Sequence, residues 1–241
     1  HSSRTLDKRS MLEIGSARVV RQGIGLLGGT FDPVHNGHLA AARAALETFN
    51  LGCVEFVPAR APWQKAFVTP ARIRLEMLKL ALEDEPDFRV NELELLRSGP
   101  TYTIDTLEAI RSRLGPGYPL VLILGGDQWL NFHTWRSWQR LADYANIAVC
   151  ERAGEPIRTN PSIESWAAAR RVEAKELTRH ASGAIAFFSM PSHKASATAI
   201  RSMLGTQPFP DAMRRVGDWL PFPVAAYIAA HGLYGTRSGR F

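Results

Sequence analysis

The chain has 241 residues, 45% of them hydrophobic, and a formal net charge of +6. This length and composition suit one large globular domain or two small ones, and no apolar run approaches the roughly 20 residues that span a bilayer. The basic excess fits either a nucleic-acid binder or a site for small polyphosphates, and the dispersed placement of Lys and Arg disfavours nucleic acid.

The start of the chain, residues 1–16, is polar and lacks the apolar segment of a signal peptide. We expect residues 1–18 to form a flexible extension or the remnant of an expression tag, in which Met11 could be the natural start. Two isolated cysteines, Cys53 and Cys150, lie in apolar runs, which indicates buried free thiols rather than a zinc site or a disulfide. A reducing cytoplasm fits this pattern. Neither a membrane nor nucleic acid is expected as a partner, and a homo-oligomer remains possible.

Short β-rich apolar runs alternate along the chain with segments of helical spacing. The predicted strands are 19–27, 54–57, 88–95, 120–124, 147–150 and 185–188. The predicted helices are 39–49, 69–83, 104–114 and 223–231, and residues 162–180 are expected to form a polar helix over the sheet edge. Thr69 is a plausible N-cap with Pro70 at the first helical position, and Gly232 is a natural C-cap.

Strands separated by helices of this length imply right-handed crossovers and a mostly parallel sheet. The expected fold class is therefore α/β, with a doubly wound sheet of about six strands and helices on both faces. We expect one domain over residues 19–235 and a tail over 236–241. Ligands of such sheets bind beyond the carboxyl ends of the strands, so the loops that follow the strands should carry the chemistry.

The first such loop, residues 28–38, reads GGTFDPVHNGH. Gly28 and Gly29 lack a Cβ and let a ligand approach the backbone closely. His35 and His38 stand where the next helix should begin, and a helix N-terminus offers free N–H groups and partial positive charge to a phosphate. Two imidazoles at this place could donate hydrogen bonds to phosphoryl oxygens.

Two other interpretations of this region are weaker. The two histidines could be metal ligands, but no Cys or Glu at helix-face spacing completes a set, so no metal site made by the protein is expected. The glycines of residues 23–28 match G-x-G-x-x-G, which in an oxidoreductase lies between a strand and a helix. Here the apolar residues between the glycines have the spacing of a buried strand, and a Pro-containing turn follows.

The motif at residues 28–38 closely resembles the T/HxGH signature of the nucleotidyltransferase superfamily, a Rossmann-like group that includes the HIGH-type aminoacyl-tRNA synthetases. The resemblance implies that His35 and His38 contact the nucleotide phosphates at the reaction centre. It also implies that the ATP site includes the residues that precede them, Gly28, Gly29, Thr30 and Phe31.

Residues 195–201, ASATAIR, resemble a second motif of this family, I-S-x-T-x-I-R, which opens a helix that holds the β- and γ-phosphates of ATP. The resemblance assigns Ser196, Thr198 and Arg201 to those phosphates. By residue type, Ser196 is a good N-cap and Arg201 can give forked hydrogen bonds to phosphate. The preceding His193 could also reach phosphate, although a solvated loop residue is the simpler interpretation for it and for its neighbour Lys194.

The region from about residue 23 to residue 235 resembles the bacterial nicotinate-nucleotide adenylyltransferases. Four stretches carry the resemblance: 57–65, a loop that would bring Lys65 to a phosphate, 99–107, 125–135 and 220–234. The resemblance implies that the pyridine ring stacks on Trp135 and that its carboxylate is received near Tyr102 and Thr103. It further places Asp127, beside Gly126, at the ribose hydroxyls of ATP.

Simpler roles remain open for two of these residues. Trp135 lies near Trp129 and Trp138 in the sequence, so helical packing is a fair alternative for its ring. Thr103 could be a plain N-cap, a role that is compatible with binding an anion.

The reaction that the resemblance implies is transfer of AMP from ATP, with Mg²⁺, to nicotinate mononucleotide. His35, His38, Lys65 and Arg201 would be its catalytic residues. An enzyme of the same fold with another acceptor, such as nicotinamide mononucleotide or pantetheine phosphate, is the main alternative. A non-enzymatic nucleic-acid binder and a fragment of a tRNA synthetase are weaker ones, because residues 193–197 only faintly echo a KMSKS loop.

Overall fold

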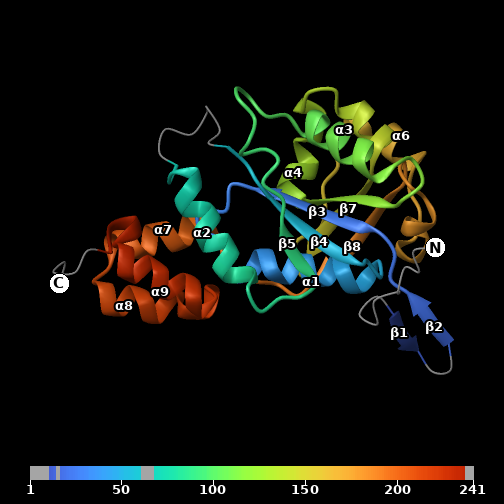
Figure 1. Ribbon diagram of the computed structural model, residues 1–241. Coiled ribbons are helices and arrows are strands. Elements are labelled where there is room, and N and C mark those ends of the chain that lie inside the picture. The colour runs from blue at the N-terminus through green and yellow to red at the C-terminus, as the bar shows by residue number, and fades with distance from the viewer. Residues whose placement is uncertain (1–10, 15–16, 61–67, 237–241) are drawn as a thin grey trace.

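The computed structural model describes residues 11–14, 17–60 and 68–236, and its centre is a six-stranded parallel sheet (Figure 1). The strands lie in the order β5-β4-β3-β6-β7-β8. Their bounds are β3 Ile24–Gly29, β4 Cys53–Pro58, β5 Phe88–Val90, β6 Leu120–Gly125, β7 Asn146–Arg152 and β8 Ile185–Met190. A separate antiparallel hairpin, β1 Met11–Ile14 and β2 Ala17–Val20, precedes the sheet. The predicted α/β class with a six-stranded parallel sheet is confirmed.

Helices cover both faces of the sheet. The α-helices are α1 Asn36–Thr48, α2 Ala71–Leu82, α3 Thr103–Leu114, α4 Gly126–Leu130, α5 Leu141–Tyr144, α6 Glu164–Ala168, α7 Ala197–Thr206, α8 Phe209–Val216 and α9 Phe222–His231. Figure 1 shows α1 on one face and α3, α4 and α6 on the other, with α2, α7, α8 and α9 grouped beyond one end of the strands. Among the described residues, no helix has both the length and the apolar character that crossing a membrane requires.

Both faces of the sheet are buried, as the apolar runs of the strands predict. In β6, Val121 and Ile123 belong to the core on the side of α1 and α2. Leu122 and Leu124 belong to a second core on the side of α3. Successive side chains of a strand point to opposite faces, so an uninterrupted apolar run is what a strand buried on both sides requires.

The glycines of residues 23–28 serve packing within the sheet. Ile24–Gly29 is strand β3, paired in parallel with β4 and β6. A Cβ on Gly25 would lie 3.0 Å from methyl carbons of Leu51 and Ile123. The match to a dinucleotide motif is therefore accidental, because the strand continues through it and a turn, not a helix, comes directly after it.

Two predicted strands have different bounds in the structure. The strand predicted at 88–95 ends at Val90, because the Asn91 side chain accepts a hydrogen bond from the Leu93 N–H and starts a turn. The strand predicted at 19–27 is divided. Its first two residues belong to β2, and Gly23, with a φ of +111°, separates them from β3.

The single helix predicted for residues 162–180 is wrong. That segment contains η4 Pro161–Ile163, the short α6 and η5 Ala174–Arg179. Between α6 and η5 the chain is extended beside β8, where the Val172 N–H donates to the Ile185 carbonyl at 2.8 Å. Pairing with the free edge of the sheet outweighs the local helical preference.

The two predicted helix caps differ in outcome. Gly232 ends α9 with a left-handed φ of 60°, as expected. Thr69 is not the N-cap of α2: the helix begins one residue later, its N-cap is Pro70, and no side chain caps it. The Thr69 N–H donates to the carboxylate of Asp32 at 3.0 Å, so this residue has a tertiary contact instead.

We expect Leu107→Ala to lower the free energy of unfolding by about 2–5 kcal/mol, because Leu107 is fully buried between α3 and the sheet. Leu96→Ala is the matched control, since this side chain is 81% exposed and its loss should cost less than about 0.5 kcal/mol. Urea unfolding followed by circular dichroism measures both. Equal losses would show that α3 does not pack as described.

Candidate functional site

The two histidines of the first loop form a stacked pair at the N-terminus of α1. His35 is the N-cap, and its Nδ1 accepts a hydrogen bond from the Gly37 N–H at 3.0 Å. Nδ1 of His38 accepts from the His35 N–H at 3.1 Å, and the ring centroids are 3.7 Å apart. Since Nδ1 is the acceptor in both rings, the proton of each neutral imidazole lies on Nε2. The pair therefore offers two N–H donors to a ligand.

The surroundings of the pair favour the uncharged imidazoles. Burial lowers the pKa of His35 to about 3, with smaller lowering by Coulombic interaction with Arg152 and His193. Burial also lowers the pKa of His38 well below its ordinary value, followed by the effects of His35 and Arg152. The ring of His38 lies between His35 and Phe31, whose centroid is 4.9 Å away. Two neutral donors within range of the Arg152 cation make a place that favours an anion.

Gly37 allows the second predicted segment to lie against the first. A Cβ at this position would lie 2.8 Å from Cε1 of His35 and 3.4 Å from the carbonyl oxygen of Ala195. Ser196, the next residue, is the N-cap of α7, where its hydroxyl accepts from the Ala199 N–H at 3.0 Å. The cap predicted for Ser196 is confirmed, and the N-termini of α1 and α7 meet.

Arg201 links these two segments directly. One guanidinium nitrogen donates to the main-chain carbonyl of Asp32 at 2.8 Å, and another lies 3.5 Å from the hydroxyl of Thr198. The side chain is half-buried. One of the guanidinium nitrogens that we expected to donate to phosphate therefore donates to the turn before the histidines.

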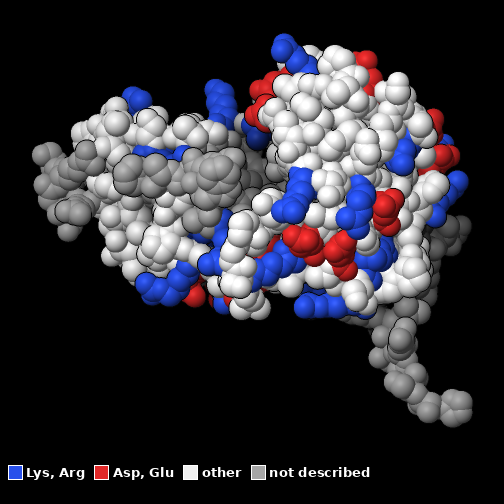
Figure 2. All heavy atoms as spheres, turned by 90° about the horizontal axis from the view of Figure 1, so that it is seen from above, with Lys and Arg blue, Asp and Glu red and all other residues white. Residues whose placement is uncertain are grey.

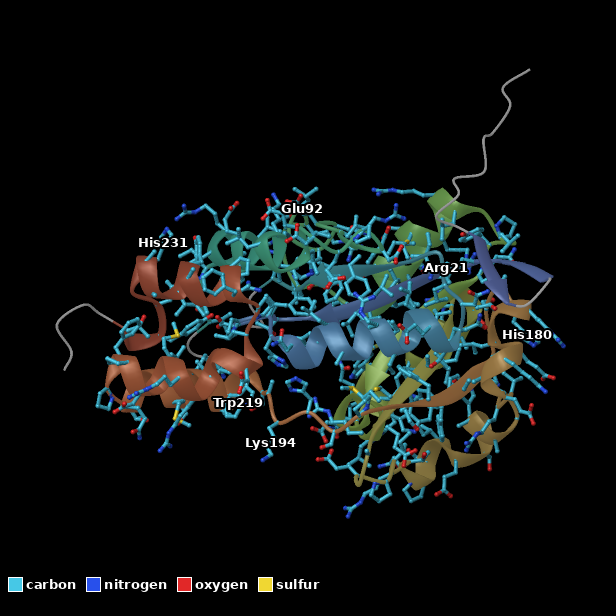
Figure 3. The ribbon with its side chains drawn as sticks, turned by 90° about the horizontal axis from the view of Figure 1, so that it is seen from below. Arg21, Glu92, His180, Lys194, Trp219 and His231 are labelled. Carbon is cyan, nitrogen blue, oxygen red and sulfur yellow. The ribbon has the colours of Figure 1, made fainter. Side chains whose placement is uncertain are left out.

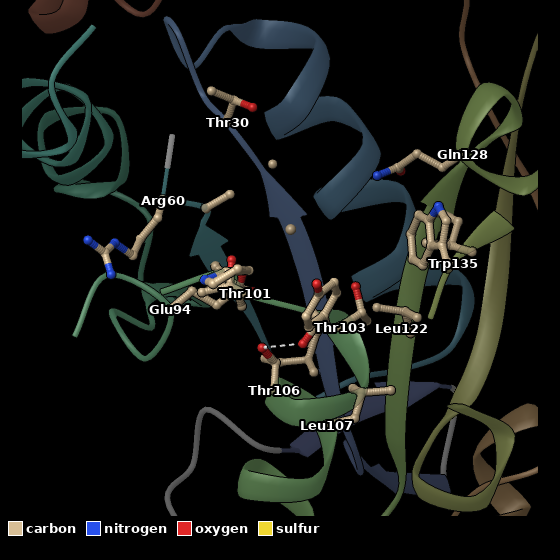
Figure 4. Close-up of a pocket in the computed structure, with 18 of the residues that line it drawn as sticks. Thr30, Arg60, Glu94, Thr101, Thr103, Thr106, Leu107, Leu122, Gln128 and Trp135 are labelled. Atoms are coloured by element: carbon tan, nitrogen blue, oxygen red, sulfur yellow. Dashed lines mark hydrogen bonds between the residues drawn. The ribbon is translucent and has the colours of Figure 1, made fainter. Parts of the chain in front are cut away.

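A cavity of about 640 Å³ opens beside the end of β3 (Figure 4). It shares Gly28, Gly29 and Thr30 with the loop that carries the histidines. Its opposite walls include Tyr102 and Thr103, at the start of α3, together with Trp135. The structure thus brings three of the four acceptor residues expected from the resemblance, Tyr102, Thr103 and Trp135, into one cavity that adjoins the histidine loop.

The tryptophans of this region divide between core and cavity. Trp129 is fully buried, and its Nε1 donates to the hydroxyl of Thr159 at 2.9 Å. Trp135 is half-buried; it packs against Phe132, with 5.6 Å between ring centroids, and lines the cavity. Packing and ligand contact are therefore compatible roles for its ring.

The remaining predicted residues lie in different surroundings. Phe31 is only 2% exposed and packs against Phe56 as well as His38. Gly126 and Asp127 open α4 directly after β6, and Asp127 is exposed. Lys65 lies outside the described residues.

The sequence analysis missed several polar residues of the site. Arg152 is the last residue of β7, so the rule that ligands bind at the carboxyl ends of strands would have indicated it. Arg60, after β4, and Glu94 both line the cavity. Burial raises the pKa of the Glu94 carboxyl, while hydrogen bonds with Thr101 and Thr106 oppose the shift. These positions had no motif of their own.

The segment before α7 contains one residue turned to the site and one turned away. Nδ1 of His193 accepts from the Ala195 N–H at 3.1 Å, which leaves Nε2 as its donor, and the residue lies near enough to His35 to affect its pKa. Lys194 is exposed and points outward from the link between β8 and α7 (Figure 3). The solvated interpretation therefore suits Lys194 but not His193.

Basic residues are not gathered into one continuous patch on the face shown in Figure 2, where acidic side chains lie among them. Several pair directly, such as Arg140 with Glu108 at 2.9 Å and Arg89 with Glu55 at 2.9 Å. Nucleic acid is bound through phosphate contacts along an extended basic surface. The described residues form no such surface on this face.

Known proteins resemble this chain over most of its length. Residues 26–203 match the model of the cytidylyltransferase-like family. A probable nicotinate-nucleotide adenylyltransferase of Bordetella petrii is 43% identical over 212 residues, which cover 88% of this chain and 98% of that protein. A protein of the same name from Neisseria meningitidis is 38% identical over 213 residues, with the same coverage of each chain.

Solved structures share the fold at low sequence identity. The nicotinic acid mononucleotide adenylyltransferase of Plasmodium falciparum complexed with NaAD has a TM-score of 0.67 and 18% identity, over 90% of this chain and 98% of that one. The same enzyme complexed with APC has a TM-score of 0.66. At this identity the likeness supports the Rossmann-like fold and no more.

We expect the imidazoles of His35 and His38 to stay neutral, with the proton on Nε2, far below pH 6.5, where a free imidazole titrates. Because His35 has a pKa of about 3 in the fold, the unfolded chain binds more protons between pH 6.5 and 3. The contribution of this group to stability is therefore complete above pH 6.5 and lost progressively as pH falls towards 3. Nitrogen NMR shifts of the imidazoles during a pH titration measure this. Protonation of His35 near pH 6.5 would contradict the described burial.

Proposed function

Since the chain belongs to the cytidylyltransferase-like family and, within it, to the nicotinate-nucleotide adenylyltransferases, we propose that it transfers AMP from ATP to nicotinate mononucleotide. The products are nicotinate adenine dinucleotide, a precursor of NAD, and pyrophosphate. The observation that carries the proposal is the stacked pair of neutral imidazoles, with Nε2 free, beside a cavity large enough for a nucleotide.

The reaction needs no nucleophile from the protein. An oxygen of the acceptor's phosphate attacks the α-phosphorus of ATP in line, and the bond to the pyrophosphate oxygen breaks. Negative charge accumulates on the α-phosphate oxygens, where Nε2–H of His35 and His38 would donate hydrogen bonds. Such catalysis consists of positioning and charge stabilisation.

Pyrophosphate would leave over the N-terminus of α7. This helix offers unpaired N–H groups and the positive end of its dipole, and Ser196, Thr198 and Arg201 stand in its first turns. Arg152 and His193 would add donors, since both lie near enough to His35 to affect its pKa. These groups would stabilise the negative charge of the leaving group.

The acceptor would occupy the cavity. Its pyridine ring would stack on Trp135, because an aromatic face suits a planar ring. Its carboxylate would meet the N-terminus of α3 at Tyr102 and Thr103, where helix N–H groups are unpaired. Lys65 would hold a phosphate, and Asp127 the ribose hydroxyls of ATP. Gly28, Gly29 and Thr30 separate the two substrates.

Mg²⁺ would enter with ATP. No group of three or more His, Cys, Asp or Glu side chains that could hold a metal ion occurs in the part of the chain that the structure describes. The donor set therefore fits a Mg²⁺ held mainly by phosphate oxygens and water, which would neutralise charge on the triphosphate.

Cys53 and Cys150 are free thiols, so we place the reaction in a reducing cytoplasm.

We expect the purified protein to release pyrophosphate fastest from ATP with nicotinate mononucleotide. The same assay is run with nicotinamide mononucleotide or pantetheine phosphate as the acceptor, and with CTP in place of ATP. Faster turnover with another acceptor would replace the proposed substrate.

We expect His38→Ala to lower kcat at least about a hundredfold, because it removes a donor to the transition state. His231→Ala is the matched control, since His231 is exposed at the end of α9.

We expect Trp135→Ala to raise KM for nicotinate mononucleotide about tenfold, through loss of stacking on the pyridine ring, and to leave KM for ATP within about twofold. Trp138→Ala is the control, because Trp138 packs against Trp166, with 5.1 Å between centroids, in the same region. Steady-state kinetics with each substrate varied in turn measures both. Equal changes in the two KM values would assign Trp135 to packing alone.

A further inference from the structure

Asp32 joins four parts of the chain at the turn that precedes the histidines. Its carboxylate accepts from the Thr69 N–H at 3.0 Å through Oδ2 and from the Tyr234 hydroxyl through Oδ1. Its main-chain carbonyl accepts from Arg201 at 2.8 Å. The residue is 5% exposed. Asp32 therefore connects the histidine loop to the start of α2, to α7 and to the turn after α9.

A buried cation balances the charge of this carboxylate. Arg74, in α2, is fully buried and donates to three main-chain carbonyls, of Thr69 at 2.7 Å and of Thr30 and Ala59 at 2.8 Å. Burial lowers the pKa of Arg74, and the negative charge of Asp32 opposes that shift. The two charges thus stabilise each other in the interior.

Tyr234 reaches Asp32 through a strained turn. It follows the C-cap Gly232, and its own φ is +57°. A non-glycine residue keeps this left-handed conformation only where its surroundings impose it, and such strain is common at functional sites. Burial and the neighbouring Asp32 raise the pKa of the Tyr234 hydroxyl, so it stays a hydrogen-bond donor. The last described turn of the chain thus holds the Tyr234 hydroxyl on the carboxylate of Asp32.

We propose that Tyr234 is a positioning residue for the triphosphate site, which acts by holding Asp32 in place. With its hydroxyl on Oδ1, the carboxylate stays directed at Tyr234 and Thr69, and its carbonyl stays aligned with Arg201. A carboxylate released from this contact would face a site built for anions and repel the phosphates. The inference rests on the proposed use of that site for ATP.

The test compares Tyr234→Phe with Tyr227→Phe, which removes a hydroxyl from α9 in the same group of helices. Calorimetry measures binding of a nonhydrolysable ATP analogue and, separately, of nicotinate mononucleotide. We expect Tyr234→Phe to weaken binding of the analogue about tenfold, because the released carboxylate would repel the phosphates and residues that act through another typically change binding by this order. Affinity for nicotinate mononucleotide should stay within about twofold. Tyr227→Phe should bind both ligands as the unchanged protein does.

A double-mutant cycle tests the route through Asp32. In an Asp32→Asn background, Tyr234→Phe should weaken analogue binding by no more than about twofold, because the charged partner is gone. An equal loss in both backgrounds would overturn the proposal. So would an equal loss for both ligands, no loss, or a Tyr234→Phe protein that is unfolded at the assay temperature, since the contact would then serve the fold alone.

The outcome is separable from that of the proposed reaction. Binding of the ATP analogue requires no turnover and no particular acceptor. If the unchanged protein released no pyrophosphate with nicotinate mononucleotide, the proposed function would fail. The comparison of Tyr234→Phe with Tyr227→Phe would still decide the role of Tyr234.

Discussion

Two hydrogen bonds from the main chain determine which donors this site offers a ligand. The Gly37 N–H donates to Nδ1 of His35, and the His35 N–H donates to Nδ1 of His38. They fix the ring orientations and leave Nε2 of each imidazole as a donor. They also complete the cap of α1, so the geometry is maintained by the helix itself. Stacking then holds the two donors side by side. A pair of this kind suits a phosphate group, which has several acceptor oxygens.

The electrostatic surroundings extend this preference. Arg152, His193 and Arg201 come from strand β7, from the segment after β8 and from α7. They meet near the histidines because parallel strands carry their following loops to the same edge of the sheet. The one carboxylate at the turn, Asp32, is bonded on both oxygens and balanced by Arg74. An anionic ligand would thus meet donors and cations, with the nearby negative charge held in the interior.

The cavity and the histidine loop both border the end of β3. The proposed binding sites of the acceptor and of ATP are therefore neighbours. Gly28, Gly29 and Thr30 border both. A ligand phosphate in the cavity and the α-phosphate of ATP at the histidines would approach each other across these small residues. The aromatic wall at Trp135 lies on the other side of the cavity and contacts the core through Phe132, so the ring has a firm support.

The sequence by itself determined the alternation of strands and helices, the parallel sheet and the serine cap of α7, because these depend on residue type and spacing over a few positions. Only the tertiary structure decided the short β5, the extended segment beside β8, the use of the Thr69 N–H by Asp32 and the division of Arg201 between Asp32 and Thr198. It also revealed Arg152 at the site, and it decided between the two roles that the sequence had left open for His193. Apart from β5, which a local turn at Asn91 ends, each case involves a partner more than about ten residues away in sequence that competes with a local preference, and local preferences are weak compared with tertiary contacts.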